Sequence, residues 1–471
     1  MKSVRPTWQE SVFISLCAAT LLWKLLLPGF IGMASNGDFG KIIGPLCMDG
    51  ADHSADNFIF FQSDYLRGTQ YCFPAPYFSS ETALAWMASS AERMFADPVR
   101  FDIRWIGSFH ILLFLGFYFA LLLLLRPLGN AARITLSLAG LWIFADVGLI
   151  AYLNSFFTDT AAILGGLAAV ILAIHLSIAD RIALVPLTLF GLAVLLFALS
   201  KAQHAVLGVA PLAFLGWLIW RTAETNLRLA TCLAALGVLC ATVRIVASTP
   251  RSYTAQARFN LIFFYLVPSS RAPAQDLIEL GLDPSDIRYS GLTAYSPGTP
   301  MNEANWRNAF VAGTSYAGIF RFYLRHPARA LSKLESDLRN EAPNRRVLNL
   351  SNYCRDSGKP AGARDPHFGS WSALRTRLFR WWPAHILVWL ALAVLIPPFL
   401  SKHATSPSQR SVAWTISTVA LLAIAEFLTV SLADAIETAR HLLLFHIFTD
   451  LTIFLSMVLS CGWPRGGRDR A

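Results

Sequence analysis

Long apolar stretches separated by short polar turns make up most of this chain of 471 residues. A helix that crosses a bilayer needs about 20 mostly apolar residues, and about ten runs meet this length or fall slightly short of it. They lie near residues 11–31, 105–126, 133–153, 160–179, 182–199, 204–220, 229–247, 384–400, 411–431 and 441–461. The pattern predicts an all-α polytopic membrane protein with about ten transmembrane helices.

Two long polar stretches, residues 32–104 and 248–383, interrupt this pattern. Both contain many Pro and Gly residues, and neither can cross a bilayer. They divide the chain into three predicted regions. These are an N-terminal transmembrane module that includes the first loop (1–247), a loop domain (248–383) and C-terminal transmembrane helices (384–471).

Each long loop also shows helical spacing of its own. In Ser79–Ala96 the apolar residues share one face, which predicts an amphipathic helix on the outer membrane surface. An ordinary packed helix of a small extracellular subdomain is the alternative. In the second loop, residues 274–282 and 305–333 predict helices, whereas 289–300 is rich in turn residues. We therefore expect a small mixed, mainly helical subdomain there.

The orientation follows from the charges in the short turns. Every turn and terminus on one predicted side is basic: Lys2, Arg5, Arg126, Arg133, Arg181, Arg221, Arg228, Lys402, Arg410, Arg465, Arg468 and Arg470. Basic turns face the cytoplasm in polytopic proteins. An even number of spans then places both termini in the cytoplasm and both long loops outside, as in a multi-pass protein of the bacterial plasma membrane.

The first apolar run has a second interpretation. Residues Met1–Arg5 are basic and Gly32-Met33-Ala34 is a small-residue site, as in a cleaved signal peptide. However, the run is longer than a usual signal h-region and contains Lys24. We therefore expect a transmembrane helix.

The composition supports the membrane assignment. Hydrophobic residues make up 55% of the chain and charged residues 14%, whereas a soluble domain carries roughly 25% charged residues. The net charge of +10 would suggest nucleic acid as a partner of a soluble protein. Here the basic cytoplasmic turns account for much of it, and the sequence contains no nucleic-acid motif.

The cysteines indicate no metal site, because none has the spacing of metal ligands. Cys47 and Cys72 share the first loop, and Cys354 lies alone in the second. If the loops face an oxidising compartment, Cys47 and Cys72 could form a disulfide.

Five charged residues fall within the apolar runs: Lys24, Asp146, Arg244, Glu426 and Asp450. Such residues usually face the interior of a helix bundle or an aqueous cavity. Lys24 and Arg244 lie near outer helix ends, where a long side chain can reach the interface. Asp146 and Glu426 lie deeper and are predicted to contact a cation or a hydroxyl.

The first of four polar clusters at outer helix ends is Ser35–Lys41 (SNGDFGK). Asp38 has glycines on both sides, so another molecule could approach its carboxylate closely. Such a group could act as a general base that takes a proton from an attacking hydroxyl. A solvated Asn-Gly-Asp turn is the alternative.

The second cluster, Tyr152–Asp159 (YLNSFFTD), connects the third and fourth spans. Aromatic residues beside Asp159 suit the face of a sugar and its hydroxyls. Alternatively, Thr158 or Asp159 could cap the helix that follows.

The third cluster, Ser200–His204 (SKAQH), is a tight turn between the fifth and sixth spans. Lys201 and His204 could bind a phosphate. A lysine that extends to the membrane surface is the alternative.

The fourth cluster precedes the last span. On a continuous helix, Asp434, Glu437, Arg440 and His441 would share one face. That face could hold a phosphate-linked sugar, with Glu437 orienting Arg440. Local salt bridges that contribute little are the alternative. Because the inner turns are basic while the outer turns mix acids, bases and amides, one outward-facing site is the simplest interpretation.

In the order and sidedness of these motifs the chain resembles the C-type glycosyltransferase superfamily, and most closely the bacterial hexose transferases of surface-glycan biosynthesis. The resemblance is carried by Asn36–Gly40, Tyr152–Phe157, Lys201–Gln203, Leu280–Leu282, Phe322–Pro327 and Glu437–His441. It implies polyprenyl-phosphate-linked donors, extracytoplasmic transfer with inversion, and Asp38 as catalytic base. Two departures concern Asp159, where a Glu is expected, and Gln203, which lacks a preceding Pro.

We therefore expect a hexosyltransferase that moves a sugar from a polyprenyl phosphate to a glycan or a lipid-linked acceptor. The predicted catalytic residues are Asp38 and Asp159. The predicted ligands of the donor phosphate are Lys201, His204, Arg440, His441 and Arg258, and those of the sugar or acceptor are Asn36, Asn154, Gln203 and Glu437. We expect no cofactor; a divalent metal is the less favoured alternative. The rival functions are an O-antigen polymerase or ligase, a lipid-linked glycan flippase, and a non-catalytic scaffold.

Overall fold

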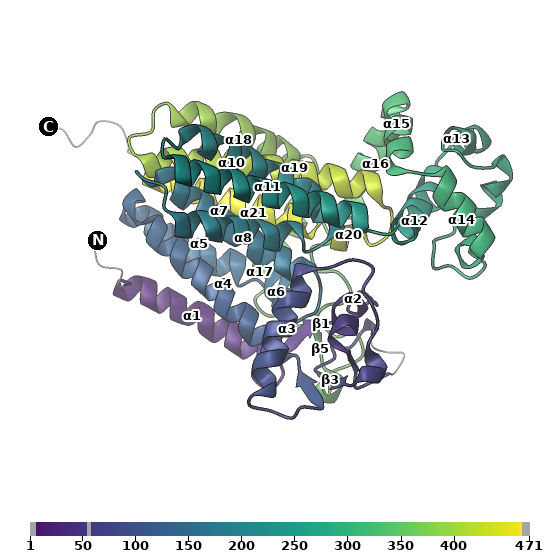
Figure 1. Ribbon diagram of the computed structural model, residues 1–471, viewed down its shortest axis with the longest axis horizontal. Coiled ribbons are helices and arrows are strands. Elements are labelled where there is room, and N and C mark those ends of the chain that lie inside the picture. Colours follow the sequence, from purple (N-terminus) through teal and green to yellow (C-terminus); the bar gives the residue numbers. More distant parts are fainter. Residues whose placement is uncertain (1–5, 54–57, 464–471) are drawn as a thin grey trace.

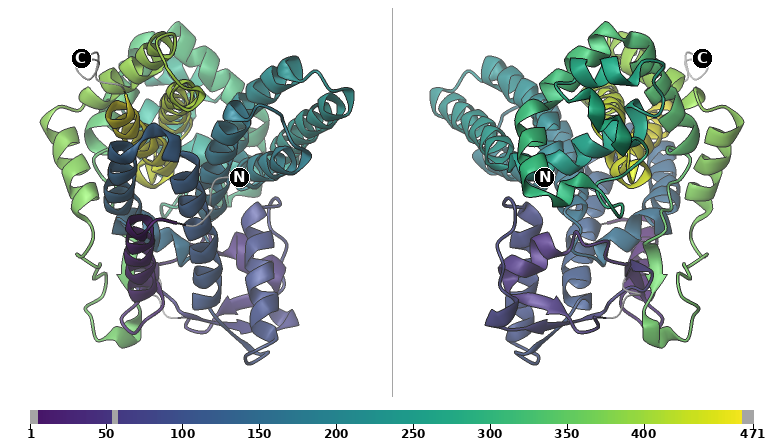
Figure 2. Two further views of the ribbon diagram at one scale, coloured as in Figure 1. Left: turned by 90° about the vertical axis from the view of Figure 1, so that its left-hand side faces the viewer. Right: turned by 90° about the vertical axis from the view of Figure 1, so that its right-hand side faces the viewer.

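The computed structural model describes residues 6–53 and 58–463. Its long helices form a bundle, and the two loops gather at one end of it (Figure 1). In the end-on views the teal helices of residues 209–248 splay away from the rest of the bundle (Figure 2). The bundle helices are α1 (Trp8–Leu25), α4 (Arg104–Leu124), α5 (Asn130–Phe144), α7 (Asp159–Ile178), α8 (Leu184–Ala198), α10 (Val209–Arg221), α11 (Thr225–Ser248), α18 (His385–Ser401), α19 (Pro407–Ala433) and α21 (Leu443–Gly462).

Each of the ten predicted apolar runs overlaps one of these helices. Among the described residues, six helices are long and apolar enough to cross a membrane, or up to eight if two bent helix pairs each count as one span. One bent pair is α17 (Ser370–Trp381) with α18, at 104°. The helix α1 falls outside this set, and α8 has only 15 residues. The structure therefore supports a multi-pass membrane protein, and the number ten stays a prediction.

The start of α1 and the end of α21 lie at the same end of the bundle. Glu10 pairs there with Arg126 at 2.6 Å and with Arg133 at 3.4 Å. Gln409 donates to the carbonyl of Gly462 at 2.9 Å. Both long loops lie at the opposite end (Figure 1). The assignment of the basic end to the cytoplasm stays a prediction.

The first loop folds into short strands and helices. It contains β1 (Ile31–Met33), α2 (Gly40–Ile43) and a three-stranded antiparallel sheet of β2 (Met48–Gly50), β3 (Asp64–Arg67) and β4 (Arg100–Asp102) in that order. A disulfide joins Cys47 to Cys72, as the sequence suggested. This bond ties the end of the α2 segment to the chain that leads toward α3.

The helix predicted at Ser79–Ala96 is α3 (Ser80–Arg93), capped by the side chain of Ser79. One of its faces, which includes Ala85 and Ala88, is buried against neighbouring helices. On the other face Trp86 and Met87 are exposed. The packed interpretation therefore holds for one face, and the exposed apolar face fits the predicted membrane surface.

The second loop has two parts. The helices α12 (Arg251–Phe259), α13 (Pro273–Glu279), α14 (Ala304–Gly313) and α15 (Tyr316–Arg325) share one hydrophobic cluster and protrude from the bundle (Figure 1). The chain returns along α16 (Pro327–Asn340) to β5 (Leu350–Tyr353), which pairs antiparallel with β1. The predicted domain at 248–383 is thus a protruding helical part followed by a part that packs on the first loop.

The second part also explains Lys24. Its ammonium group lies 2.6 Å from the carboxylate of Asp365, and both side chains are buried. Lys24 therefore forms an internal ion pair and does not extend to the membrane surface. Together with the β1–β5 pairing, this pair fixes the first loop, which carries Asp38, to the end of the bundle.

Candidate active site

Asp38 lies in a tight turn directly before α2. The side-chain oxygen of Asn36 accepts from the backbone N–H of Asp38 at 3.2 Å, and Gly37 has φ of +96° with open space around it. Lys41 follows one helical turn later, and its ammonium pairs with Oδ1 of Asp38. The turn predicted as the alternative is therefore real, and it holds the carboxylate in place.

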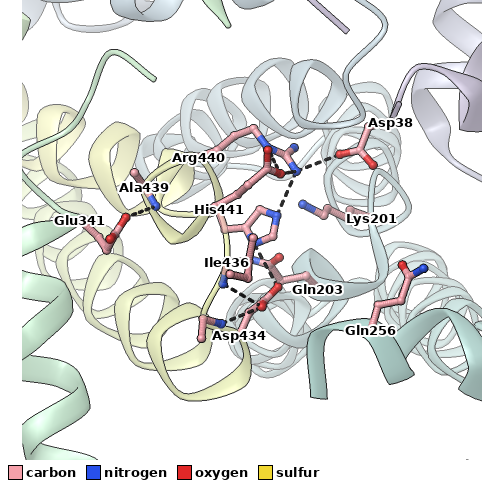
Figure 3. Close-up of polar contacts among 12 residues, drawn as sticks. Asp38, Lys201, Gln203, Gln256, Glu341, Asp434, Ile436, Ala439, Arg440 and His441 are labelled. Atoms are coloured by element: carbon pink, nitrogen blue, oxygen red, sulfur yellow. Dashed lines mark hydrogen bonds and ion pairs between the residues drawn. The ribbon is translucent and has the colours of Figure 1, made fainter. Parts of the chain in front are cut away.

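Arg440 binds the other oxygen of Asp38. Its Nη2 lies 2.9 Å from Oδ2 of Asp38 and 2.8 Å from Oε2 of Glu437 (Figure 3). Its guanidinium lies 5.2 Å from the centre of the Phe157 ring. Asn36 donates to Oε2 of Glu437 at 3.0 Å. Glu437 thus lies where it can orient Arg440, and the ion pair of Arg440 with Asp38 joins the first cluster to the fourth.

The fourth cluster is not the single helix face that the sequence suggested. The helix α19 ends at Ala433, and α20 covers only Thr438–His441. Glu437 between them has φ of +54°, a left-handed conformation that is uncommon for residues other than Gly. The break turns Arg440 toward Asp38, whereas His441 faces Asp434 at 3.6 Å. A continuous helix could not provide this geometry.

Asp159 is buried beneath these groups, next to two basic residues. Its Oδ1 lies 3.9 Å from Nζ of Lys201 and 3.6 Å from Nε2 of His204. Ser200 contacts the other ring nitrogen of His204 at 2.8 Å. Asp159 is only 4% exposed, whereas 24% of the Asp38 side chain is exposed, so Asp38 is the more accessible of the two predicted catalytic carboxylates. The contacts of Asp159 suit the positioning of Lys201 and His204. The side chain of Thr158 makes no capping hydrogen bond to α7.

The surrounding charges set the ionisation of the site. Burial raises the pKa of Asp38, but the charges of Arg440, Lys41 and Lys201 outweigh it and hold that pKa well below its usual range. Burial alone would lower the pKa of Arg440, but the negative charges of Asp38 and Glu437 outweigh this effect and hold that pKa above its usual range. Asp38 and Arg440 therefore stay charged throughout the physiological range.

The pKa values of two groups beside this pair, His441 and Asp434, are shifted in opposite directions. Burial, together with the charges of Lys201 and Arg440, lowers the pKa of His441 well below its usual range, so its ring is neutral. Burial raises the pKa of Asp434 to about 6. Asp434 is therefore an acid of the site whose charge changes near pH 6.

Two predicted ligands lie elsewhere. Asn154 is fully buried, and its amide donates to the carbonyls of Leu25 and Ile31 at 3.0 and 2.9 Å. Arg258 is 3% exposed and donates to the backbone oxygen and hydroxyl of Thr314 within the protruding part. Both side chains already have structural partners, so we remove them from the candidate site. Gln203 lies in the cluster (Figure 3), where it donates to Glu426 at 2.8 Å.

Three residues near the site were not predicted from the sequence as functional residues. Lys41 lies within the first motif, and its spacing from Asp38 could have indicated the ion pair. Tyr253, whose ring centre lies 4.9 Å from Nζ of Lys41, and Gln256, which points toward the side of the cluster where Lys201 lies (Figure 3), come from α12. No local pattern connects α12 to the first loop.

The described residues provide no candidate metal site. Within residues 6–53 and 58–463, no group of three or more His, Cys, Asp or Glu side chains is arranged to hold a metal ion. The cations of the site are therefore Lys41, Lys201 and Arg440. Independence from metal stays a prediction.

Comparisons with known proteins agree with the membrane assignment. No curated protein and no solved structure matches the chain. One family model, described as the YfdI N-terminal transmembrane domain, matches residues 1–466. This match names no broader superfamily, so the resemblance to C-type glycosyltransferases stays an expectation. Because the model covers nearly the whole chain, the protein belongs to the YfdI N-terminal transmembrane domain family.

Proposed function

We propose that this protein is a membrane glycosyltransferase that moves a hexose from a polyprenyl-phosphate donor to a glycan acceptor outside the cytoplasm. A membrane protein of glycan-related processes fits the family match. The observation that carries the proposal is the arrangement around Asp38. An ionised carboxylate with 24% of its side chain exposed is held between two cations, at the loop-bearing end of a bundle of apolar helices.

The proposed reaction is a single displacement at the anomeric carbon. The acceptor oxygen forms a bond to that carbon while the bond from the carbon to the phosphate oxygen breaks. Asp38 accepts the hydroxyl proton, and the phosphate leaves with the bonding electron pair. The low pKa of Asp38 keeps the carboxylate ionised but makes it a weak base, so the proton moves to it only as the attacking hydroxyl turns acidic in the transition state. Attack opposite to the leaving group inverts the configuration.

The cations assist departure. A sugar linked to a polyprenyl phosphate is a phosphodiester with one negative charge, and the leaving phosphate gains a second. Arg440, Lys201 and Lys41 are fixed in the structure before this charge develops, so they stabilise it without reorganisation. Asp159 and Glu437 hold Lys201 and Arg440 in place. The lipid tail of the donor would stay in the bilayer beside the apolar helices.

Reconstitution tests the proposal and separates it from its rivals. Purified protein in lipid nanodiscs would receive polyprenyl-phosphate-[¹⁴C]glucose and polysaccharide extracted from cells that lack the gene. A transferase adds label to the polysaccharide. A flippase in vesicles would move the labelled lipid across the bilayer without adding label to polysaccharide, and a polymerase or ligase would change chain length or carrier. Absence of label from the polysaccharide, with a panel of polyprenyl-phosphate hexoses, would contradict the proposal.

A further inference from the structure

A pocket lies beside the proposed catalytic cluster, between the first loop and the protruding part of the second. Its volume is about 430 Å³, within the range of roughly 300–1,000 Å³ that is typical of small-molecule sites. Pro76 of the first loop forms one wall. The polar residues of the lining are Ser252, Tyr253, Gln256, Asn302 and Arg307.

Tyr253 connects this pocket to Asp38. It lines the pocket, and its ring centre lies 4.9 Å from Nζ of Lys41, which pairs with Asp38. Gln256, one turn later on α12, points toward the side of the cluster that carries Lys201 (Figure 3). Its side-chain oxygen accepts from the hydroxyl of Tyr295 at 3.4 Å. The contacts between the pocket and the proposed base thus run through two side chains, Tyr253 and Lys41.

The lining is suited to a saccharide. Gln256 and Asn302 offer amide donors and acceptors, Ser252 a hydroxyl, and Tyr253 a ring on which the apolar face of a sugar can pack. Arg307 is the one charged residue of the lining, and its positive charge disfavours cationic ligands. All these residues come from segments outside the candidate membrane spans, which favours an aqueous ligand over a polyprenyl tail.

We propose that this pocket binds the acceptor, a hydroxyl-rich glycan of neutral or acidic character, and presents one of its hydroxyls to Asp38. The inference rests on the proposed function and specifies where its acceptor binds. The donor would then approach from the bilayer and the acceptor from the aqueous side, and the two would meet at Asp38 and Arg440.

Direct binding tests the pocket without requiring turnover. Isothermal titration would measure the affinity of the polysaccharide from cells lacking the gene for wild-type protein in nanodiscs and for the Gln256→Ala and Asn302→Ala variants. Each lost hydrogen bond should weaken binding about three- to tenfold. Ser252→Trp, which fills the pocket, should abolish measurable binding. Asn305→Ala is the matched control, because Asn305 is exposed in α14 and does not line the pocket.

The outcomes separate this inference from the proposed function. Weaker binding in the pocket variants, together with wild-type affinity in Asn305→Ala, supports the inference. Wild-type affinity in all three pocket variants overturns it, whether or not the protein transfers sugar. If wild-type protein binds the polysaccharide through the pocket but never transfers a hexose to it, the proposed function fails and the binding site stands. If wild-type protein does not bind the polysaccharide at all, the pocket assignment fails.

Discussion

Two carboxylates in this protein each pair with two cations, yet their surroundings differ. Asp450 on α21 pairs with Arg345 at 2.5 Å and with Arg375 of α17. Its side chain is 7% exposed, and those of Arg345 and Arg375 are 6% and 1% exposed. Asp38 pairs with Lys41 and Arg440, but its side chain is 24% exposed and a pocket lies nearby.

The comparison separates a structural ion cluster from a chemical one. The Asp450 cluster joins the chain after α16 to α17 and α21 and leaves no route for a substrate. The Asp38 cluster joins the first loop to α20 with one side open beside Gly37. The ion pairs of Asp450 therefore stabilise the packing of helices, whereas in our proposal those of Asp38 take part in the reaction. The exposure of the carboxylate distinguishes the two clusters.

The largest expected effect is the loss of turnover in Asp38→Asn. Asparagine retains the size and polarity of the turn residue but cannot accept the proton. The rate of transfer should fall about 10²–10⁴-fold, while the thermal unfolding temperature changes little. Initial rates with labelled donor, measured beside unfolding curves, check both parts. Near-normal transfer would leave Asp38 as a turn residue and move the base to Glu437, whose side chain is 44% exposed, ahead of the buried Asp159.

The second largest effect is the loss of stability expected from a substitution of Asp450. Asp450→Asn leaves two buried guanidinium ions without their counter-ion, which should cost about 3–5 kcal/mol. Thermal unfolding in nanodiscs should therefore show a far lower midpoint than in Asp38→Asn, while the folded fraction still transfers sugar. Equal destabilisation by the two substitutions would remove the distinction between the clusters.

Donor affinity should respond to Arg440 to a smaller degree. Arg440→Ala loses a charged hydrogen-bonding contact worth about 1.5–3 kcal/mol, so the dissociation constant for polyprenyl-phosphate hexose should rise roughly 10- to 100-fold. Arg440→Lys should recover part of this, because the charge remains but the planar fork is lost. Arg321→Ala, an exposed arginine of α15, is the control. An unchanged donor affinity in Arg440→Ala would exclude this phosphate site.

The smallest effect concerns pH. Burial raises the pKa of Asp434 to about 6, so this carboxyl is neutral below that pH and negative above it. The added negative charge beside His441 disfavours an anionic donor, and donor affinity should fall by about tenfold or less as the pH rises through 6. Asp434→Asn should remove this dependence, because Asp38 stays ionised throughout the range. A dependence that survives in Asp434→Asn would assign it to another group.

The sequence predicted the elements better than their contacts. Helix positions could be predicted, because the length and spacing of apolar runs depend on local composition. The Cys47–Cys72 disulfide could be suggested because both cysteines lie in the same loop. The motifs that contain Asp38 and Arg440 could also be predicted, because polar residues at helix ends are easily distinguished from the apolar runs beside them. Asn154 illustrates the limit: a polar residue in a promising turn can serve two buried carbonyls, and only the packing reveals this.

The contribution of α12 could not be predicted. Tyr253 and Gln256 reach the site because the second loop folds back over the first, through contacts between residues about two hundred positions apart, well beyond any local periodicity. The break at Glu437, with its left-handed backbone, could not be predicted either, because the hydrogen bond from Asn36 to Glu437 and the ion pair of Arg440 with Asp38 join segments about 400 positions apart.

The anomeric configuration of the transferred hexose tests the central claim most directly. Polyprenyl-phosphate glucose of known configuration would be supplied to wild-type protein in nanodiscs with the extracted polysaccharide, and the product linkage would be determined by NMR. Direct attack by a hydroxyl deprotonated by Asp38 predicts inversion, with product formation slowed about 10²–10⁴-fold in Asp38→Asn. Retention would indicate a covalent intermediate or two displacements, and it would contradict a single displacement with Asp38 as general base.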